Sequence, residues 1–160
     1  MVDYKFFPDS YGRALAKNQF ADQQLSIIFS HMRNYRARLL DDTIAITKAL
    51  ADAQRLRIIM ALRQGELCSC QLAELLHLAH STVSKHMSIL RHARLVVAHR
   101  RGRWTYFRRA DAKVSVEAKG VLGWLDRALA ESRQIKEDAR RAAEIKKQDV
   151  TTLCRKKNRR

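Results

Sequence analysis

Two cysteines separated by one residue, Cys68 and Cys70, lie in the segment from Glu66 to Leu72, where helical apolar spacing begins. Thiolates are soft ligands, and they select soft, thiophilic ions over hard ions that prefer oxygen. On a regular helix, residues i and i+2 lie about 200° apart, so both sulfurs reach one ion only if the first turn loosens. A position near a helix N-terminus also lowers a thiol pKa and favours the thiolate. The pair is therefore a candidate soft-ion site whose occupation distorts the start of a helix.

For Cys68, though not for Cys70, a plainer interpretation is also open. Cys68 lies one helical turn before Leu72, where a free cysteine serves as a small buried apolar residue. Cys70 falls off the apolar face, beside Ala73 and Glu74, and has no such packing role. A disulfide between these two helical neighbours would be strained, and three cysteines cannot all pair within one chain. Soft-ligand chemistry favours ion binding for the pair, and core packing remains the alternative for Cys68.

The segment after this pair has the features of a DNA-reading helix. From residue 81 to about residue 92, the apolar side chains of Val83, Met87 and Leu90 recur at i, i+4 and i+7 and should face the core. The opposite face is polar and free to meet bases and phosphates. The residues of this face that we expect to contact DNA are Ser81, Thr82, Ser84, Lys85 and Ser88.

Two β-rich runs, residues 95–99 and 104–108, flank a basic loop and predict a hairpin. Gly102 supplies the positive φ that the loop needs. Residues 81–110 contain eight Lys or Arg and no acidic residue, so basic charge is concentrated where contact is expected. A helix, a short turn, a second helix and a basic hairpin, in this order, predict a winged helix-turn-helix. The hairpin residues expected to reach the DNA backbone or minor groove are Arg100, Arg101 and Arg103.

The remaining segments must position these two regions. Apolar spacing predicts helices over about 41–51, 53–63 and 68–76. A helical pattern over 114–147 carries an apolar stripe that would otherwise face water, so we expect it to form a dimer. We divide the chain into an N-terminal arm with an extra helix (1–40), a winged helix-turn-helix domain with the thiol site (41–113), a C-terminal dimerisation helix (114–147) and a basic tail (148–160), of which we expect residues 155–160 to be mobile. The predicted fold is mainly α with a β-hairpin wing.

Composition favours a nucleic-acid partner and one compact domain. The 160 residues carry 32 Lys and Arg against 16 Asp and Glu, a net charge of +16. No apolar run approaches the roughly 20 residues that a membrane span needs, and residues 1–9 lack the pattern of a signal peptide. We expect a cytoplasmic protein without a membrane partner, whose thiols stay reduced.

Three stretches carry a resemblance to a known family: residues 50–58, 66–72 and 81–86, the last followed by Leu90. Together they resemble the ArsR/SmtB family of bacterial metal-responsive repressors, and the Glu-Leu-Cys-x-Cys element is similar to that of its arsenic-sensing branch. The likeness covers about residues 41–107, and residues 1–40 carry no part of it. It implies a homodimeric winged-helix repressor that leaves operator DNA when a metalloid binds. The chain departs from the family pattern at His77 and Arg94, where many members have glycine.

The resemblance also implies arsenite or antimonite, As(III) or Sb(III), as the inducer, with no cofactor required. Sensors of this kind often take a third thiol three residues after the second cysteine, where this chain has Ala73. Cys154, in a Leu-Cys-Arg sequence that some relatives share, is the other candidate, from either subunit; the alternative is a free thiol in the tail. The candidate metal ligands are therefore Cys68, Cys70 and Cys154. Zinc on residues 114–147 is not expected, because that segment has no histidine.

Three other classes of function are alternatives to a metalloid-released repressor. One keeps the DNA binding but makes the cysteines a redox switch. Another is a non-specific nucleic-acid-binding protein, for which the tail and the net charge would suffice. A thiol oxidoreductase normally has a Cys-x-x-Cys motif in a βαβ unit, and the chain has neither, so we do not expect an enzyme.

Overall fold

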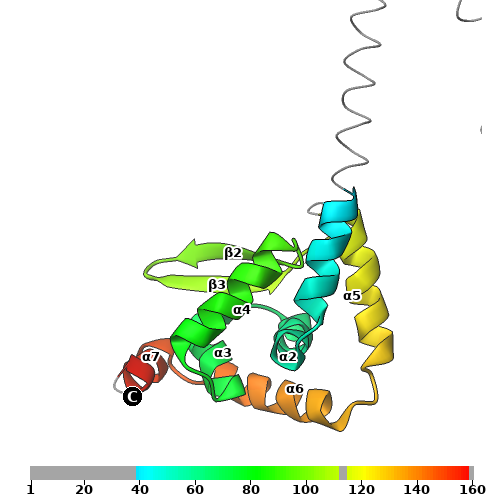
Figure 1. Ribbon diagram of the computed structural model, residues 1–160. Helices are drawn as coiled ribbons and strands as arrows, with labels where there is room; N and C mark the ends of the chain where they lie inside the picture. Colours follow the sequence, from blue (N-terminus) through cyan, green and yellow to red (C-terminus); the bar gives the residue numbers. More distant parts are fainter. Residues whose placement is uncertain (1–38, 112–114, 159–160) are drawn as a thin grey trace, which may run out of the picture. The chain divides into compact units, whose positions relative to one another are not determined.

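The computed structural model describes residues 39–111 and 115–158 of the chain (Figure 1). The arm and extra helix expected in residues 1–40 lie almost wholly outside these ranges. None of the described helices is both long enough and apolar enough to cross a membrane. A first helix covers residues 39–50, and the further elements are α2 (Ala53–Ala61), η1 (Leu62–Gln64), β1 (Leu67–Cys68), α3 (Ser69–Leu76), α4 (His80–His92), β2 (Val96–Arg101), β3 (Trp104–Arg109), α5 (Val116–Ala128), α6 (Arg133–Lys146) and α7 (Val150–Asn158).

The winged helix-turn-helix predicted from the sequence is confirmed. In α4, the side chains of Val83, Met87 and Leu90 are buried, as their spacing predicts. The turn between α3 and α4 requires a left-handed residue, and His77 adopts φ 55° there. Helix α4 begins at His80 with Ala79 as its N-cap, two residues before Ser81, the N-cap that the sequence predicts. The apolar faces of α3 and α4 therefore share one core, and the polar face of α4 is left outside it.

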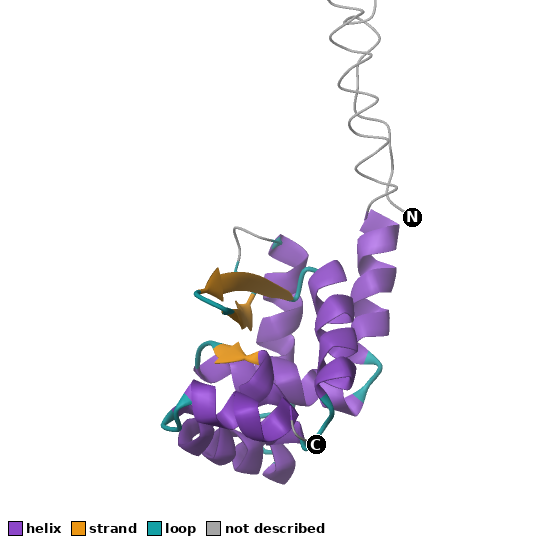
Figure 2. Ribbon diagram, turned by 90° about the vertical axis from the view of Figure 1, so that its left-hand side faces the viewer, coloured by secondary structure: helices purple, strands orange, loops and turns teal. Residues whose placement is uncertain are grey.

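The hairpin belongs to a three-stranded sheet of order β1-β3-β2, drawn in Figure 2. Strands β2 and β3 pair antiparallel with His99 opposite Tyr106, and Gly102 takes φ 61° in their loop. The third strand, β1, was not predicted, because two residues are too few for a sequence period. It pairs with β3 and places Cys68 opposite Tyr106. This pairing fastens the cysteine segment to the wing.

The expectation of a single helix over residues 114–147 is wrong. Residues 116–146 form two helices, α5 and α6, which are separated at residues 129–132. The break lets α6 turn back and pack against α2 and α3, where Ala142 and Ile145 are buried. A buried ion pair fixes this position, because Arg57 on α2 donates to both carboxylate oxygens of Asp138 on α6, at 2.7 and 2.8 Å. Tertiary packing, which local sequence does not reveal, therefore decides where the helix ends.

The mobility expected for residues 155–160 is also wrong as far as residue 158, because residues 150–158 of the basic tail form α7. Its apolar side chains Val150, Leu153 and Cys154 recur at i, i+3 and i+4. Helix α7 packs on α3, and Leu153 and Cys154 are buried. The basic residues that follow conceal this short amphipathic pattern in the sequence.

Replacing Arg57 with Met should test whether the ion pair anchors α6. Among the residues that the structure describes, the Asp138 carboxylate, 1% exposed, would keep only Gln134 as a side-chain donor, at 3.0 Å. We expect the free energy of unfolding, measured by urea denaturation, to fall by about 3–5 kcal/mol. The control Lys147→Gln breaks an exposed ion pair with Glu144 and should change it by less than about 0.5 kcal/mol. Equal effects of the two substitutions would show that the buried pair is not an anchor.

Candidate thiol site and nucleic-acid interface

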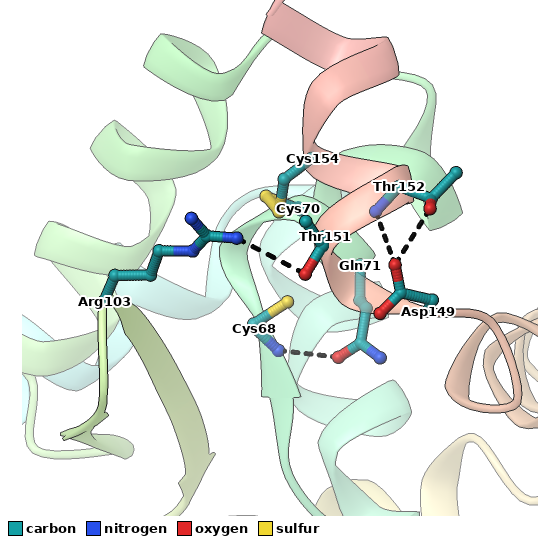
Figure 3. Close-up of a disulfide and its surroundings, with 8 residues drawn as sticks. All are labelled: Cys68, Cys70, Gln71, Arg103, Asp149, Thr151, Thr152 and Cys154. Atoms are coloured by element: carbon teal, nitrogen blue, oxygen red, sulfur yellow. Dashed lines mark hydrogen bonds between the residues drawn. A yellow bond between two sulfur atoms is a disulfide. The ribbon is translucent and has the colours of Figure 1, made fainter.

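The three cysteines of the chain meet at one place (Figure 3). Cys68 ends β1, Cys70 lies in the first turn of α3, and Cys154 comes from α7 of the same chain. Their sulfur atoms all lie within 4.8 Å of one another, and the three residues are 1–4% exposed. The structure therefore brings together all three ligands predicted from the sequence.

The arrangement of Cys68 and Cys70 differs from the expected one. Cys68 is not helical; it has extended backbone angles, φ −85° and ψ 167°, and forms the N-cap of α3. Its backbone N–H donates to the side-chain oxygen of Gln71 at 2.9 Å, which holds this geometry. Because the 200° offset of a regular helix does not apply, the two sulfurs converge without any loosening of the first turn. The premise of the expected distortion, that both cysteines lie in one regular helical turn, is therefore wrong.

Cys70 is joined to Cys154 by a disulfide, with the two Cα atoms 5.3 Å apart, whereas Cys68 is a free thiol. This pairing differs from the strained one considered between Cys68 and Cys70. Cys70 was expected to lie off the apolar face of its helix, but it is buried because α7 covers that side of α3. Helices α3 and α7 hold the sulfurs of Cys70 and Cys154 at bonding distance. These two thiols can therefore be oxidised to a disulfide.

The expected lowering of the thiol pKa does not hold for Cys68. Burial raises the pKa of the Cys68 thiol, and hydrogen bonds from the backbone N–H groups of Gln71 and Cys70 oppose this only in part. Removing a charged thiolate from water outweighs the favourable dipole of the short helix α3. Cys68 therefore holds its proton more strongly than an exposed thiol does.

Residues beside the cysteines also contact the wing. Glu66, two residues before Cys68, accepts a hydrogen bond from Arg101 at 3.0 Å and lies 3.4 Å from His99. On the other side, Arg103 donates to the hydroxyl of Thr151 on α7 at 3.4 Å (Figure 3). Of the three arginines predicted to contact DNA, Arg103 therefore touches a helix that carries a cysteine, and Arg101 touches the residue directly before β1. Sequence analysis missed Glu66 and Thr151, because their partners lie 35 and 48 residues away.

The side chains predicted to face DNA lie outside the core, and only Thr82 is half-buried. On α4 the exposed ones are Ser81, Ser84, Lys85 and Ser88, and on the hairpin they are Arg100, Arg101 and Arg103. Figure 1 shows the hairpin of β2 and β3 extending beside α4. The helix and the hairpin together offer polar and cationic groups to one elongated ligand.

Comparison with known proteins identifies relatives of this arrangement. Residues 52–97 match the family model described as "Bacterial regulatory protein, arsR family". The arsenic resistance transcriptional regulator ArsR1 of Pseudomonas putida is 34% identical over 104 residues, which cover 62% of this chain and 77% of that protein. A transcriptional repressor SmtB homolog from Synechocystis is 47% identical over 66 residues, 41% of this chain and 50% of that protein. The arsenical resistance operon repressor of Bacillus subtilis is 39% identical over 69 residues, 42% of this chain and 66% of that protein. This chain therefore spans half to about two thirds of the latter two relatives.

Solved structures agree with this result. A homodimeric winged helix-turn-helix DNA-binding domain from Mycobacterium bovis, described as a possible ArsR-family regulator, has a TM-score of 0.50 and 32% identity over 61% of this chain and 91% of that one. HlyU from Vibrio cholerae has a TM-score of 0.50 and 26% identity over 57% of this chain and 95% of that one. The fold, the matched segment and the relatives are those of DNA-binding transcriptional regulators rather than enzymes. The chain belongs to the ArsR/SmtB family of transcriptional repressors.

Proposed function

We propose that this protein represses transcription as a dimer on operator DNA and is released when arsenite or antimonite binds Cys68, Cys70 and Cys154. The observation that carries the proposal is the cluster of three buried sulfur atoms within 4.8 Å of one another. Three curated relatives are named as arsenic or arsenical resistance regulators, which supports this class of inducer. The setting of the proposed repressor is the cytoplasm, where Cys70 and Cys154 are reduced.

The donor set fits a soft trivalent ion. In the reduced protein the cluster would consist of three thiols, with no His, Asp or Glu, so it would offer nothing that favours a hard, oxygen-preferring ion. Binding exchanges the three hydroxyl groups of arsenous acid for three thiol sulfurs and releases three molecules of water. The reaction needs no net loss of protons, so it remains open to a thiol such as Cys68, whose pKa burial raises.

The proposed release acts through elements that also hold the DNA-binding groups. Helix α3 packs against α4, and β1 pairs with β3 of the hairpin. Arg103 contacts Thr151 on α7, and Arg101 contacts Glu66 beside β1. A small shift of β1 or α7 toward the ion therefore alters the positions of α4 and of two wing arginines together.

The proposed dimer uses α5 and the helix of residues 39–50, which lie side by side (Figure 1). Between them is an apolar hollow lined by Ile46, Leu50, Val121 and Trp124, and the side chain of Trp124 is 55% exposed. Helix α6 is excluded from this role, because its apolar side faces α2 and α3 of the same chain. The homodimeric relative from Mycobacterium bovis supports a two-fold assembly, which suits a palindromic operator.

A redox-responsive repressor is a second candidate, favoured by the disulfide between Cys70 and Cys154. Hydrogen peroxide would oxidise the two thiols to this disulfide and be reduced to two molecules of water. The bond consumes two of the three proposed ligands, so the oxidised and the ion-bound states exclude each other. Cys68, which has no part in the disulfide, separates the two candidates.

DNA recognition should divide between α4 and the wing. Ser84→Ala removes a hydroxyl from the exposed face of α4, so we expect about fivefold weaker binding to a duplex selected by the wild-type protein and little change for random duplex. Arg103→Gln should weaken both, and the slope of log affinity against log salt should fall by about 0.9. Fluorescence anisotropy measures the affinity of each of the two variants for each of the two duplexes. Equal wild-type affinity for every duplex near physiological salt would favour non-specific nucleic-acid binding instead.

Arsenite should dissociate the reduced protein–DNA complex through the cysteines. Cys68→Ser and Cys70→Ser should bind the selected duplex normally yet stay bound when arsenite is added, and Cys154→Ser should respond only at higher arsenite concentration. Ser69→Ala, which changes the same segment without removing a thiol, is the matched control. Release of Cys70→Ser at the wild-type arsenite dose would refute the proposed site. Release of wild-type protein and Cys68→Ser by peroxide, together with no response to arsenite, would favour the redox candidate.

The dimer should depend on the hollow beside α5. Trp124→Glu places a charge on its apolar wall, which opposes burial against a second copy. We expect sedimentation to show a monomer at micromolar concentration, where the wild type is a dimer. Ala130→Glu adds the same charge at an exposed position just after α5 and should remain dimeric. A dimer that persists in Trp124→Glu would move the interface elsewhere.

A further inference from the structure

A cationic cleft lies between the second half of α4 and the start of β2. Its polar lining consists of Ser88, Arg91, His92 and Arg94, its floor is formed by the first residues of β2, and no acidic residue lines it. Arg91 and His92 are exposed and have no ion-pair partner within residues 39–111 and 115–158. The cleft therefore presents hydrogen-bond donors and positive charge, and the charge of Arg91 has no internal compensation within these residues.

Arg94 occupies a backbone position that suits glycine. It has φ 54°, because the turn after α4 closes with hydrogen bonds from Arg94 N–H to the carbonyl of Arg91 and from Leu95 N–H to that of Leu90, both 3.0 Å. A residue with a side chain is strained in this left-handed conformation, whereas glycine is not. Strain of this kind persists where a side chain is needed for function.

The stability of the fold does not account for Arg94. Basic residues in the last turn of a helix favour its negative end, which explains Arg91 and His92 but not a residue beyond the C-cap Ala93. The ion pair of Arg94 with Asp42, at 3.6 Å, has an arginine side chain that is 56% exposed, and such pairs contribute little to stability. The same contact holds the guanidinium at the edge of the cleft.

We propose that this cleft binds a phosphate of the operator backbone, with Arg91 and Arg94 as its charged ligands. The inference rests on the proposed DNA binding and adds a contact to it. Ser88 connects the two surfaces, because it lies on the exposed face of α4 and also lines the cleft. A duplex that meets Ser84 and Ser88 on α4 continues over the cleft, where a phosphodiester matches its charge. Phosphate contacts of this type set the position of the protein on DNA without reading sequence.

Arg94→Gly separates a role in binding from a role in folding. The substitution removes the guanidinium and also the strain at φ 54°, so we expect an equal or higher melting temperature together with weaker DNA binding. Affinity should fall by roughly fivefold for selected and random duplexes alike, and the salt slope should fall by less than about 0.9, because Asp42 already pairs with this guanidinium. Arg91→Gln, which removes an unpaired charge, should lower affinity similarly and the slope by the full amount of about 0.9.

Two further variants complete the experiment. Arg94→Lys keeps the charge and the strain and should retain most of the wild-type affinity. This result would show that weaker binding by Arg94→Gly comes from the missing charge rather than from altered turn geometry. Arg140→Gln, at an exposed position on α6, removes the same unit of net charge and should leave the slope unchanged. Wild-type affinity and slope in Arg94→Gly, or equal losses in Arg140→Gln, would overturn the cleft while leaving the proposed function intact. Failure of the wild-type protein to bind any duplex would overturn both.

Discussion

The buried ion pair between Arg57 and Asp138 is the contact on which the rest of the C-terminal half depends. It holds α6 across α2, and this position returns the chain toward α3. Only then does α7 reach the surface of α3 and cover Cys70. Without that return, Cys154 would be a thiol on an exposed segment. A charged contact between residues 81 positions apart, together with the buried apolar side chains of α6 and α7, therefore helps to bring Cys154 to the other two cysteines.

The extended backbone at Cys68 changes how an ion can act on the DNA-binding elements. Because its sulfur already lies near those of Cys70 and Cys154, an ion does not need to unwind α3 to be bound by all three. Packed elements respond to a local shift by moving as units rather than by deforming continuously. Under the proposed function, the units available are β1, which is paired to the wing, and α7, which touches Arg103. In that proposal, a shift at the thiol site moves the wing as directly as it moves α4.

Local periodicity was sufficient to predict the winged helix-turn-helix. Val83, Met87 and Leu90 are buried as their spacing requires, and Gly102 has the expected positive φ. The features that were not predicted all depend on distant partners: the pairing of β1 with β3, the break before α6 and the docking of α7. The thiol pKa of Cys68 was predicted with the wrong sign for the same reason, since the burial that raises it comes from tertiary packing.

The basic residues of the DNA-binding region are not equivalent, although the sequence presents them as one cluster. Arg109 donates to both carboxylate oxygens of Asp126, at 2.8 and 3.1 Å, and so anchors β3 to α5. Arg108 lies 3.4 Å from Asp111. By contrast, Lys85 and Arg100 are exposed and have no acidic partner within the described ranges. Only a basic residue without an acidic partner can neutralise a DNA phosphate and release its counterion without first giving up an internal ion pair. The salt dependence of binding should therefore reflect fewer charges than the eight that the sequence places between residues 81 and 110.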